Sequence, residues 1–289
     1  MTVFGTYLLV VTGGWTDSGA IRIAPGSVRA SLEFTLAVVT ILGSHELGHY
    51  VLARRHGVSA SLPYFIPLPL LGFGTLGAVI RVRDRIPTRT ALVDIGAAGP
   101  LAGFVVALPF LAWGYAHSQF VAVDPSDASF LGPASLWSVV KHGMPVIGTV
   151  YSDNLLLRGF ERVFLGPRPP GMDVAGHPFV TAGWLGTLVT MLNLFPVGQL
   201  DAGHLTHALF GRRARTLGRL TLLGLAFLAV AYSFTWVAWF LVVSLVVGVR
   251  HPPVVWPEDP LGRGRGWVCV ATLVVAVLCF LPAPFPALL

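Results

Sequence analysis

The sequence predicts an all-α polytopic membrane protein with about seven transmembrane helices and a small β-hairpin or re-entrant element near the cytoplasmic face. Residues of the types Ala, Val, Ile, Leu, Met, Phe, Trp, Tyr and Cys make up 54% of the 289 positions, and the mean hydropathy is +0.75. Charged residues make up only 11%, whereas a soluble domain carries roughly 25%. This composition is typical of a chain surrounded by lipid. It argues against a disordered chain, a coiled coil or a soluble nucleic-acid-binding protein.

Seven apolar segments approach the length of a membrane-spanning helix, which is about 20 residues. The first segment is the shortest and ends at two glycines. The fourth ends before a proline, which disfavours helix in the preceding residue. The third is rich in Gly and Ala, so we expect it to pack closely against neighbouring helices. In chain order the predicted spans are Val3–Trp15, Leu32–Ala53, Ala91–Tyr115, Val180–Phe195, Leu217–Phe234, Thr235–Val249 and Trp267–Leu281.

The arginines predict the orientation of these spans. They cluster after the second, fourth and sixth spans, and alternation of the spans puts the three clusters on one face of the membrane. Because short cytoplasmic loops are enriched in Lys and Arg, we expect that face to be cytoplasmic and the 116–179 segment to lie outside. The clusters are Arg54, Arg55, Arg81, Arg83, Arg85 and Arg89; Arg212, Arg213, Arg215 and Arg219; and Arg250, Arg263 and Arg265.

A short segment between the second and third spans has the pattern of a β-strand. Three prolines between Ser61 and Pro69 exclude a regular helix there. From Ile80 to Arg83 apolar and basic residues then alternate, and a period of two indicates a strand. We expect Gly77–Arg83 to form one arm of a hairpin at the cytoplasmic interface, the alternative being an irregular loop.

The second span contains the sequence His45-Glu46-Leu47-Gly48-His49. Residues four apart lie on one face of a helix, so both imidazoles can bind one metal ion while Glu46 lies beside them. This is the HExxH pattern of zinc hydrolases, in which the glutamate acts as general base. A structural His/Glu pair is the alternative, but ionisable residues inside a membrane helix are costly and indicate function.

The position of this motif along its helix predicts how deep the site lies. His49 is five residues from Arg54, or about 7.5 Å at 1.5 Å per residue, and His45 is about 13 Å away. If Arg54 marks the membrane interface, the metal lies about 8–13 Å below the cytoplasmic surface.

A catalytic zinc usually has three protein ligands and a water molecule, so a third ligand is needed. Glu33 is too far along the same helix, Asp94 begins the third span, and Glu161 and Glu258 lie in loops. Asp201 remains, because Pro196 and Gly198 unwind the backbone before it, which at membrane depth is tolerated where the chain lines protein or a wet cavity. Asp201 as a helix N-cap is the alternative.

Taken together, these motifs resemble the site-2 protease family of zinc intramembrane metalloproteases, in its prokaryotic and plastid branch without a PDZ domain. The resemblance covers nearly the whole chain. It is carried by HExxH in one membrane helix and Asn193-x-x-Pro-x-x-x-x-Asp201 in a later one. It is extended by Ser61-Leu-Pro-Tyr-Phe-Ile-Pro, Gly74-Thr-Leu-Gly-Ala-Val-Ile-Arg, Asp94-Ile-Gly-Ala-Ala-Gly-Pro-Leu-Ala-Gly103 and Gly166-Pro-Arg-Pro-Pro-Gly171.

The resemblance implies a role for each motif residue. His45, His49 and Asp201 would bind one Zn²⁺ per monomer, Glu46 would be the general base, and Asn193 would hydrogen-bond the substrate or the developing oxyanion. The chain departs from the family at Asp201-Ala-Gly203, where Asp-Gly-Gly is usual, and in its short first span. The single integral-membrane domain 1–289 would have a catalytic core at about 28–215 and C-terminal helices at 216–289.

The implied activity is endopeptidase cleavage in or near transmembrane helices of membrane-anchored protein substrates, as in regulated intramembrane proteolysis. A substrate helix must unwind before attack, and the Gly77–Arg83 strand is a hypothetical partner that holds it extended. The alternatives are a prenyl-protein type of HExxH protease, a zinc transporter or sensor, and a catalytically silent scaffold.

The expected partners and location follow from the same composition and resemblance. We expect the lipid bilayer and membrane-anchored proteins as partners, and no nucleic acid. The expected location is the cytoplasmic membrane of a prokaryote, with the active site nearer the cytoplasmic face. His204 and His207, which follow Asp201, are expected to be histidines of the cytoplasmic surface, the alternative being that His204 supports the metal site.

Overall fold

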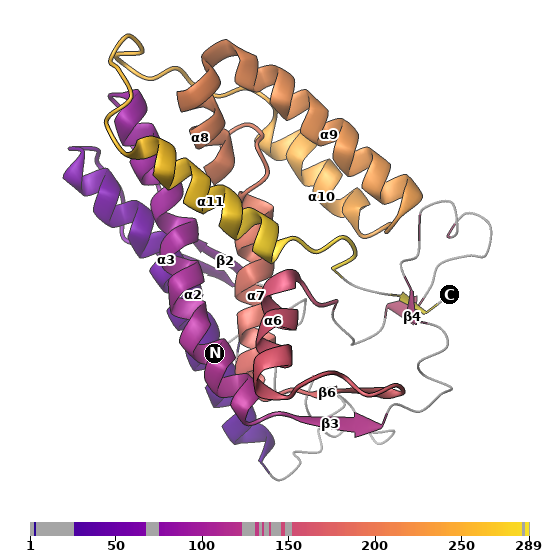
Figure 1. Ribbon diagram of the computed structural model, residues 1–289. Helices are drawn as coiled ribbons and strands as arrows, with labels where there is room; N and C mark the ends of the chain where they lie inside the picture. The colour runs from indigo at the N-terminus through magenta and orange to yellow at the C-terminus, as the bar shows by residue number, and fades with distance from the viewer. Residues whose placement is uncertain are drawn as a thin grey trace.

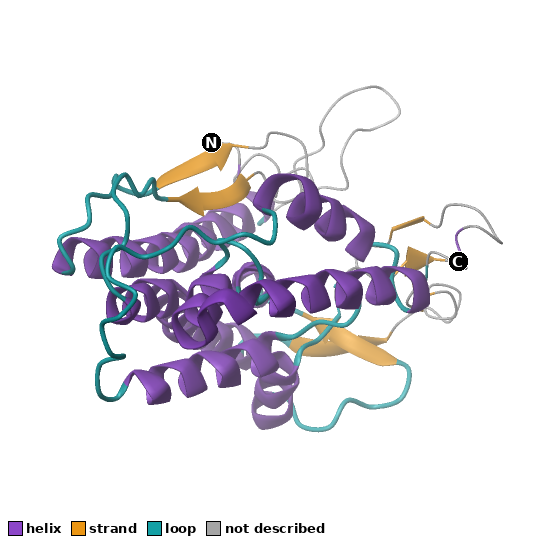
Figure 2. Cartoon of the chain, turned by 90° about the horizontal axis from the view of Figure 1, so that it is seen from above, coloured by secondary structure: helices purple, strands orange, loops and turns teal. Residues whose placement is uncertain are grey.

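Apolar helices form the body of the protein in the computed structural model, and short strands lie at its periphery (Figures 1 and 2). The structure describes residues 3, 26–67, 75–122, 131–132, 135, 139, 146–147, 152–284 and 287–288. Two long helices, α2 (Ser27–Arg55) and α3 (Arg89–Ala116), pack along one another. The hydroxyl of Thr88 starts α3 by accepting a hydrogen bond from the backbone N–H of Ala91 at 3.1 Å.

The close packing expected for the Gly/Ala-rich span is confirmed at the α2–α3 contact. A Cβ atom built on Gly48 of α2 would overlap the backbone carbonyl of Ala98 on α3. Only glycine allows the two helix backbones to approach this closely.

Helix α7 (Pro178–Asn193) packs against both α2 and α3, and the helical path is then interrupted, as expected around Pro196. The chain resumes in α8 (Asp201–Phe210), passes through a 3₁₀ turn (Gly211–Arg213) and continues as α9 (Ala214–Ala231). Gly198, with φ of +55°, takes the left-handed backbone conformation in the interruption. The break therefore sets α8 apart from α7 and places Asp201 in its first turn.

The remaining helices pack around this core. Helix α10 (Trp236–Val242) runs into a π-helical turn (Val243–Val247) and lies beside α9. Helix α11 (Arg265–Cys279) packs on α3, and the short helix α6 (Leu155–Phe164) contacts both α3 and α11. The largest cluster of buried apolar side chains joins α2, α3 and α7 to these outer helices.

The predicted hairpin is confirmed, although its second strand is Thr75–Val79 and not Gly77–Arg83 as expected. Strand β1 (Tyr64–Pro67) pairs antiparallel with β2 (Thr75–Val79), with Tyr64 opposite Val79. Backbone hydrogen bonds continue the pairing beyond β2, since Arg83 N–H donates to the carbonyl of Ser59 at 2.9 Å. The irregular-loop alternative is therefore wrong.

Other strands were not predicted from the sequence. The ribbon of β3 (Gln119–Ala122) and β6 (Met172–Ala175) lies at the end of α3 opposite to α8 (Figure 1). A smaller sheet has the order β4 (Leu131–Gly132), β7 (Ala287–Leu288) and β5 (Val146–Ile147).

Six of the seven predicted spans contain an apolar helix, whereas the first, Val3–Trp15, lies outside the described residues except for Val3. Within the described residues, three helices are long and apolar enough to cross a membrane: Ser27–Arg55, Arg89–Ala116 and Asp201–Ala231. Trp236–Val247 and Arg265–Cys279 are apolar but shorter. An integral membrane protein is therefore supported, while the count of seven crossings stays a prediction.

Arginine-rich segments that are distant in the sequence meet at one end of the bundle. The Arg89 guanidinium at the start of α3 donates to the carbonyl of Ala208 near the end of α8 at 2.6 Å. The Asp94 carboxylate of α3 contacts His56 after α2 and Arg265 at the start of α11. We call this end of the molecule the arginine end.

Candidate metal centre

The two histidines of the HExxH motif lie on one face of α2, as the spacing predicts. The ring centroids of His45 and His49 are 5.0 Å apart. Both residues are buried, with 3% and 7% of their surface exposed. One turn of helix is thus enough to bring two imidazoles to the same point inside the protein.

Asp201 brings a carboxylate to the same point from the first residue of α8. Its Oδ2 is 3.2 Å from His45 Nε2, and its Oδ1 is 3.3 Å from His49 Nε2. Asp201 is not the N-cap of α8, because Leu200 holds that position. The N-cap alternative is therefore wrong, and the carboxylate faces the two imidazoles.

The donor atoms of this cluster fit a metal ion. One donor atom each from His45, His49 and Asp201 lie within 4.8 Å of one another. The buried Asp201 Oδ2 has no hydrogen-bond partner among the described residues, although His45 Nε2 is close to it. Buried carboxylates are normally paired or bound to metal. Two imidazole nitrogens and a carboxylate oxygen, arranged around a shared point, suit Zn²⁺.

A backbone carbonyl fixes the orientation of the His49 ring. The carbonyl oxygen of Ile95 on α3 lies 2.7 Å from His49 Nδ1. A carbonyl only accepts, so Nδ1 carries the hydrogen and the lone pair is on Nε2, the atom that faces Asp201. Metal-binding histidines are commonly held in this way, and the contact raises their basicity.

The small residues of α3 make room for both imidazoles. A Cβ atom built on Gly99 would overlap His49 Nε2, and one built on Gly103 would lie 3.1 Å from the Cβ of His45. Gly99 therefore does more than allow helix packing, because any larger residue would occupy the space of a donor atom.

A cavity of about 370 Å³ adjoins the cluster. Glu46, Asn193 and Asp201 line it from three helices, and the β2 end of the hairpin, Gly77–Ile80, lines it from the side. Asn193 also reaches the cluster itself, with its Nδ2 atom 3.4 Å from His45 Nε2. The structure thus brings together all five residues that the sequence predicts for the site.

The other carboxylates considered as a third ligand lie elsewhere. Glu33 pairs with Arg29 at 2.8 Å, and Glu161 pairs with Arg168 at 2.6 Å. Asp94 is held by Arg265 and His56, and Glu258 lies exposed in a loop. Since the prenyl-protein alternative requires a downstream glutamate, the positions of Glu161 and Glu258 argue against it.

This chain has Ala202 where the family usually has glycine, and the structure has room for the additional methyl group. Ala202 packs against the apolar core. A Cβ atom on Gly203, in contrast, would overlap the carbonyl of Gly198 and lie 2.7 Å from that of Val197. The chain keeps glycine where the turn before α8 leaves no space.

Two contributors to the site are not predicted from the sequence, and a third, His204, is expected at the surface with a place at the site only as the alternative. The Ile95 carbonyl and Gly99 lie within the Asp94–Gly103 motif, whose Gly/Ala content was the available signal. His204 was expected at the surface, but it lines the cavity, and its Nδ1 lies 2.6 Å from His251 Nε2. That prediction is wrong because α8 turns this face toward Gly96 of α3 rather than toward solvent.

Comparison with known proteins gives one family. The sequence pattern of peptidase family M50 matches residues 33–232. The chain is 30% identical over 261 residues to "Probable zinc metalloprotease EGY2, chloroplastic" of Arabidopsis thaliana, covering 89% of this chain and 43% of the relative. It is 31% identical over 261 residues to "Probable zinc metalloprotease EGY1, chloroplastic" of the same plant, covering 88% and 43%.

A third relative matches almost the whole chain. "Probable zinc metalloprotease EGY3, chloroplastic" of Oryza sativa subsp. japonica is 30% identical over 295 residues, covering 97% of this chain and 46% of the relative. The chain therefore spans less than half the length of these curated relatives.

Proposed function

Because this chain belongs to peptidase family M50, the site-2 protease family, we propose that it is a zinc-dependent intramembrane endopeptidase. Its substrates are membrane-anchored proteins, cleaved in or near their transmembrane helices. The observation that carries the proposal is the convergence of His45, His49 and Asp201 beside a cavity that Glu46 and Asn193 line.

Each residue of the centre has a role that its position supports. His45, His49 and Asp201 would hold one zinc ion per monomer. When bound, zinc would lower the pKa of a water molecule and polarise the scissile carbonyl. Glu46 accepts a proton from the attacking water and returns it to the leaving nitrogen. The Asn193 amide, which already lies beside His45, donates a hydrogen bond to the substrate carbonyl as negative charge develops on its oxygen.

The hairpin supplies a surface for an unwound substrate. β1 and β2 form a two-stranded sheet, so within the described residues β2 has one edge without a strand partner. Gly77–Ile80 line the same cavity as Glu46. An extended substrate segment that adds to this edge is held by backbone hydrogen bonds, with its amide bond beside the general base. The backbone N–H of Ile80 also hydrogen-bonds the Glu46 carboxylate, so Ile80→Pro should raise KM and lower kcat, whereas Ile80→Val should change neither.

The chain is a single membrane domain with its catalytic core at about 28–215 and its C-terminal helices at 216–289. The arginine end, where α2 ends and α3 begins, faces the cytoplasm of a prokaryotic cell, because positive charge is retained on that side. The centre then lies nearer the cytoplasmic face. Labelling tests this orientation: in a background without Cys269 and Cys279, Arg213→Cys should react from the cytoplasm and the exposed Val163→Cys from outside.

Replacement of the general base tests the activity. Glu46→Gln keeps the size of the side chain but cannot accept a proton, so cleavage of a membrane-anchored substrate in proteoliposomes should fall by about 10²- to 10⁴-fold. Zinc content should stay at the wild-type level, since Glu46 is not among the ligands. Activity of Glu46→Gln within about tenfold of the wild type would remove Glu46 from this role.

A further inference from the structure

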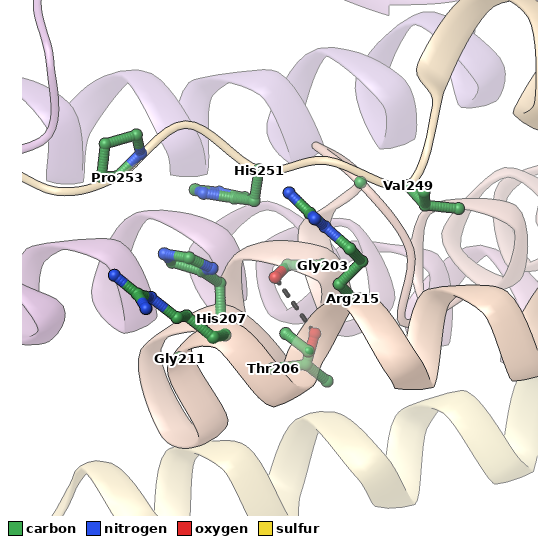
Figure 3. Close-up of a pocket in the computed structure, with 11 residues that line it drawn as sticks. Gly203, Thr206, His207, Gly211, Arg215, Val249, His251 and Pro253 are labelled. Carbon is green, nitrogen blue, oxygen red and sulfur yellow. Dashed lines mark hydrogen bonds between the residues drawn. The ribbon is translucent and has the colours of Figure 1, made fainter.

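A second cavity, separate from the metal centre, lies where α8 passes into α9. Its volume is about 450 Å³, within the range of roughly 300–1,000 Å³ common for ligand sites. Figure 3 shows Thr206 and His207 of α8 below, Arg215 of the next helix at one side and His251 on the segment that crosses above. The cavity occupies the arginine end of the molecule.

The charged groups of this cavity are all cationic. Arg212 and Arg215 line it, and no carboxylate of the described residues does. The sequence contains no Asp or Glu between Asp201 and Glu258. Within the described part of the chain, neither guanidinium makes an ion pair or a side-chain hydrogen bond. Two arginines therefore face one concave space without a counter-charge.

The histidines add hydrogen-bonding atoms. The rings of His207 and His251 are stacked, with centroids 4.3 Å apart. His251 Nδ1 donates to the carbonyl of Pro252 at 2.5 Å, and its Nε2 faces His204 at 2.6 Å. Burial, together with the neighbouring His207, lowers the pKa of His251 to about 4, so its ring is neutral at pH 7. The positive charge thus comes from the arginines, and the ring of His207 makes no hydrogen bond among the described residues.

We infer that this cavity binds a phosphate group. Guanidinium groups present paired N–H donors that match phosphate oxygens, and an imidazole supplies a further donor. Basic pockets at the cytoplasmic ends of membrane helices are suited to anionic headgroups. The phosphate comes from an anionic lipid or from a soluble compound, and both present the same oxygens to Arg212 and Arg215.

A bound phosphate would join the α8–α9 junction to the segment that carries His251. Asp201 lies at the other end of α8, ten residues before Gly211. Bound phosphate therefore holds the helix that carries a predicted zinc ligand, although binding itself does not depend on peptidase activity.

Paired charge-neutralising variants test this inference. Arg212→Gln/Arg215→Gln removes both cavity arginines, and Arg213→Gln/Arg219→Gln removes the same charge from neighbouring positions outside the cavity. Binding of inorganic phosphate to the purified full chain in detergent is followed by the melting temperature. The same variants are then measured in phosphatidylcholine nanodiscs with and without phosphatidylglycerol.

The cavity variant should lose at least about tenfold in affinity for one of the two probes, while the control pair stays within about twofold of the wild type. Saturable stabilisation by phosphatidylglycerol alone identifies a lipid, and stabilisation by inorganic phosphate identifies a soluble source. The inference is overturned if neither probe stabilises the wild type, or if both variant pairs lose affinity equally. Equal melting temperatures of the two variants without probe show that both are folded.

Discussion

Two aspartates, Asp94 of α3 and Asp201 of α8, each lie beside histidines at or near α2, but the other groups around them differ. Asp94 faces His56, the residue after α2, whereas Asp201 faces His45 and His49 within that helix. Both carboxylates are similarly buried, with 11% and 12% of the side chain exposed. Asp94 receives hydrogen bonds from Arg265 Nη2 at 2.7 Å and Nε at 3.1 Å, and lies 3.0 Å from His56 Nε2. Asp201 faces only imidazoles, and its Oδ2 has no hydrogen-bond partner in the described part of the chain.

The difference separates a structural charge cluster from a centre that needs a cation. At Asp94 the guanidinium balances the carboxylate, and the pair ties α11 to α3. At Asp201 no guanidinium or ammonium group of the described residues faces the carboxylate, and its two neighbours are imidazole nitrogens that can themselves bind a metal ion. The residue type and the degree of burial therefore do not identify a metal ligand, whereas the groups around the carboxylate do: a guanidinium at Asp94, and two imidazole donors at Asp201.

The largest expected effect is on activity. Asp201→Asn keeps the shape of the side chain but makes it a neutral, poor ligand, so peptide cleavage in proteoliposomes should be abolished. Asp94→Asn should retain activity within about tenfold, because Asp94 supports the fold and not the centre. Loss of activity to the same degree in both variants would contradict the distinction between the two aspartates.

Next in size is the effect of filling the space that α3 leaves for His49. Gly99→Ala places a methyl group where Nε2 lies, so the ring must move and zinc affinity should fall. Overpacking of this kind costs about 1–3 kcal/mol of stability. Gly43→Ala on α2 is the matched control, since a Cβ atom there contacts nothing within 4 Å. Zinc titration of both variants should show a loss in the first one only.

Metal removal should produce a smaller, thermal effect. A ligand present at about 1,000 times its dissociation constant stabilises the folded state by about 4 kcal/mol. A strong chelator should therefore lower the melting temperature of the wild type and of Asp94→Asn by several degrees. The melting temperature of Asp201→Asn should not respond, and a response equal to the wild type would indicate that zinc binds elsewhere.

The smallest expected effect is the contribution of the Asp94–Arg265 ion pair to the stability of the fold. Because Arg265 is one-third exposed, its coupling with Asp94 should be about 1 kcal/mol. A double-mutant cycle of Asp94→Asn and Arg265→Gln, read from unfolding in mild detergent, measures it. Zero coupling would show that the ion pair does not stabilise the contact between α3 and α11.

Parts of the centre were predictable because they depend on local geometry. HExxH places His45 and His49 on one face of any helix. The alternation of apolar and basic residues from Ile80 to Arg83 indicates extended backbone without knowledge of the strand that pairs with it. Asp201 was reached by excluding the other carboxylates and was then supported by the family resemblance. Asn193 came from the resemblance alone, because 148 residues separate it from His45. Nothing in the intervening sequence specifies that contact.

Other parts could not be predicted for physical reasons. Every residue has a carbonyl, so the sequence does not single out the one of Ile95 that orients His49. The pairing of Asp94 with Arg265 spans 171 residues and follows no periodicity. His204 was misassigned because its burial depends on how α8 packs against α3, and the interruption before α8 sets that packing.

The most direct test of the centre is zinc content per purified monomer in four proteins: the wild type, Asp201→Asn, Asp94→Asn and His45→Ala. The wild type and Asp94→Asn should each hold about one zinc ion, as expected for a centre with three protein ligands. Asp201→Asn and His45→Ala should bind zinc more than about 100-fold more weakly, since loss of a mere supporting contact already costs roughly 10- to 100-fold. Full zinc in Asp201→Asn together with depleted zinc in Asp94→Asn would contradict the account and assign the third ligand to Asp94.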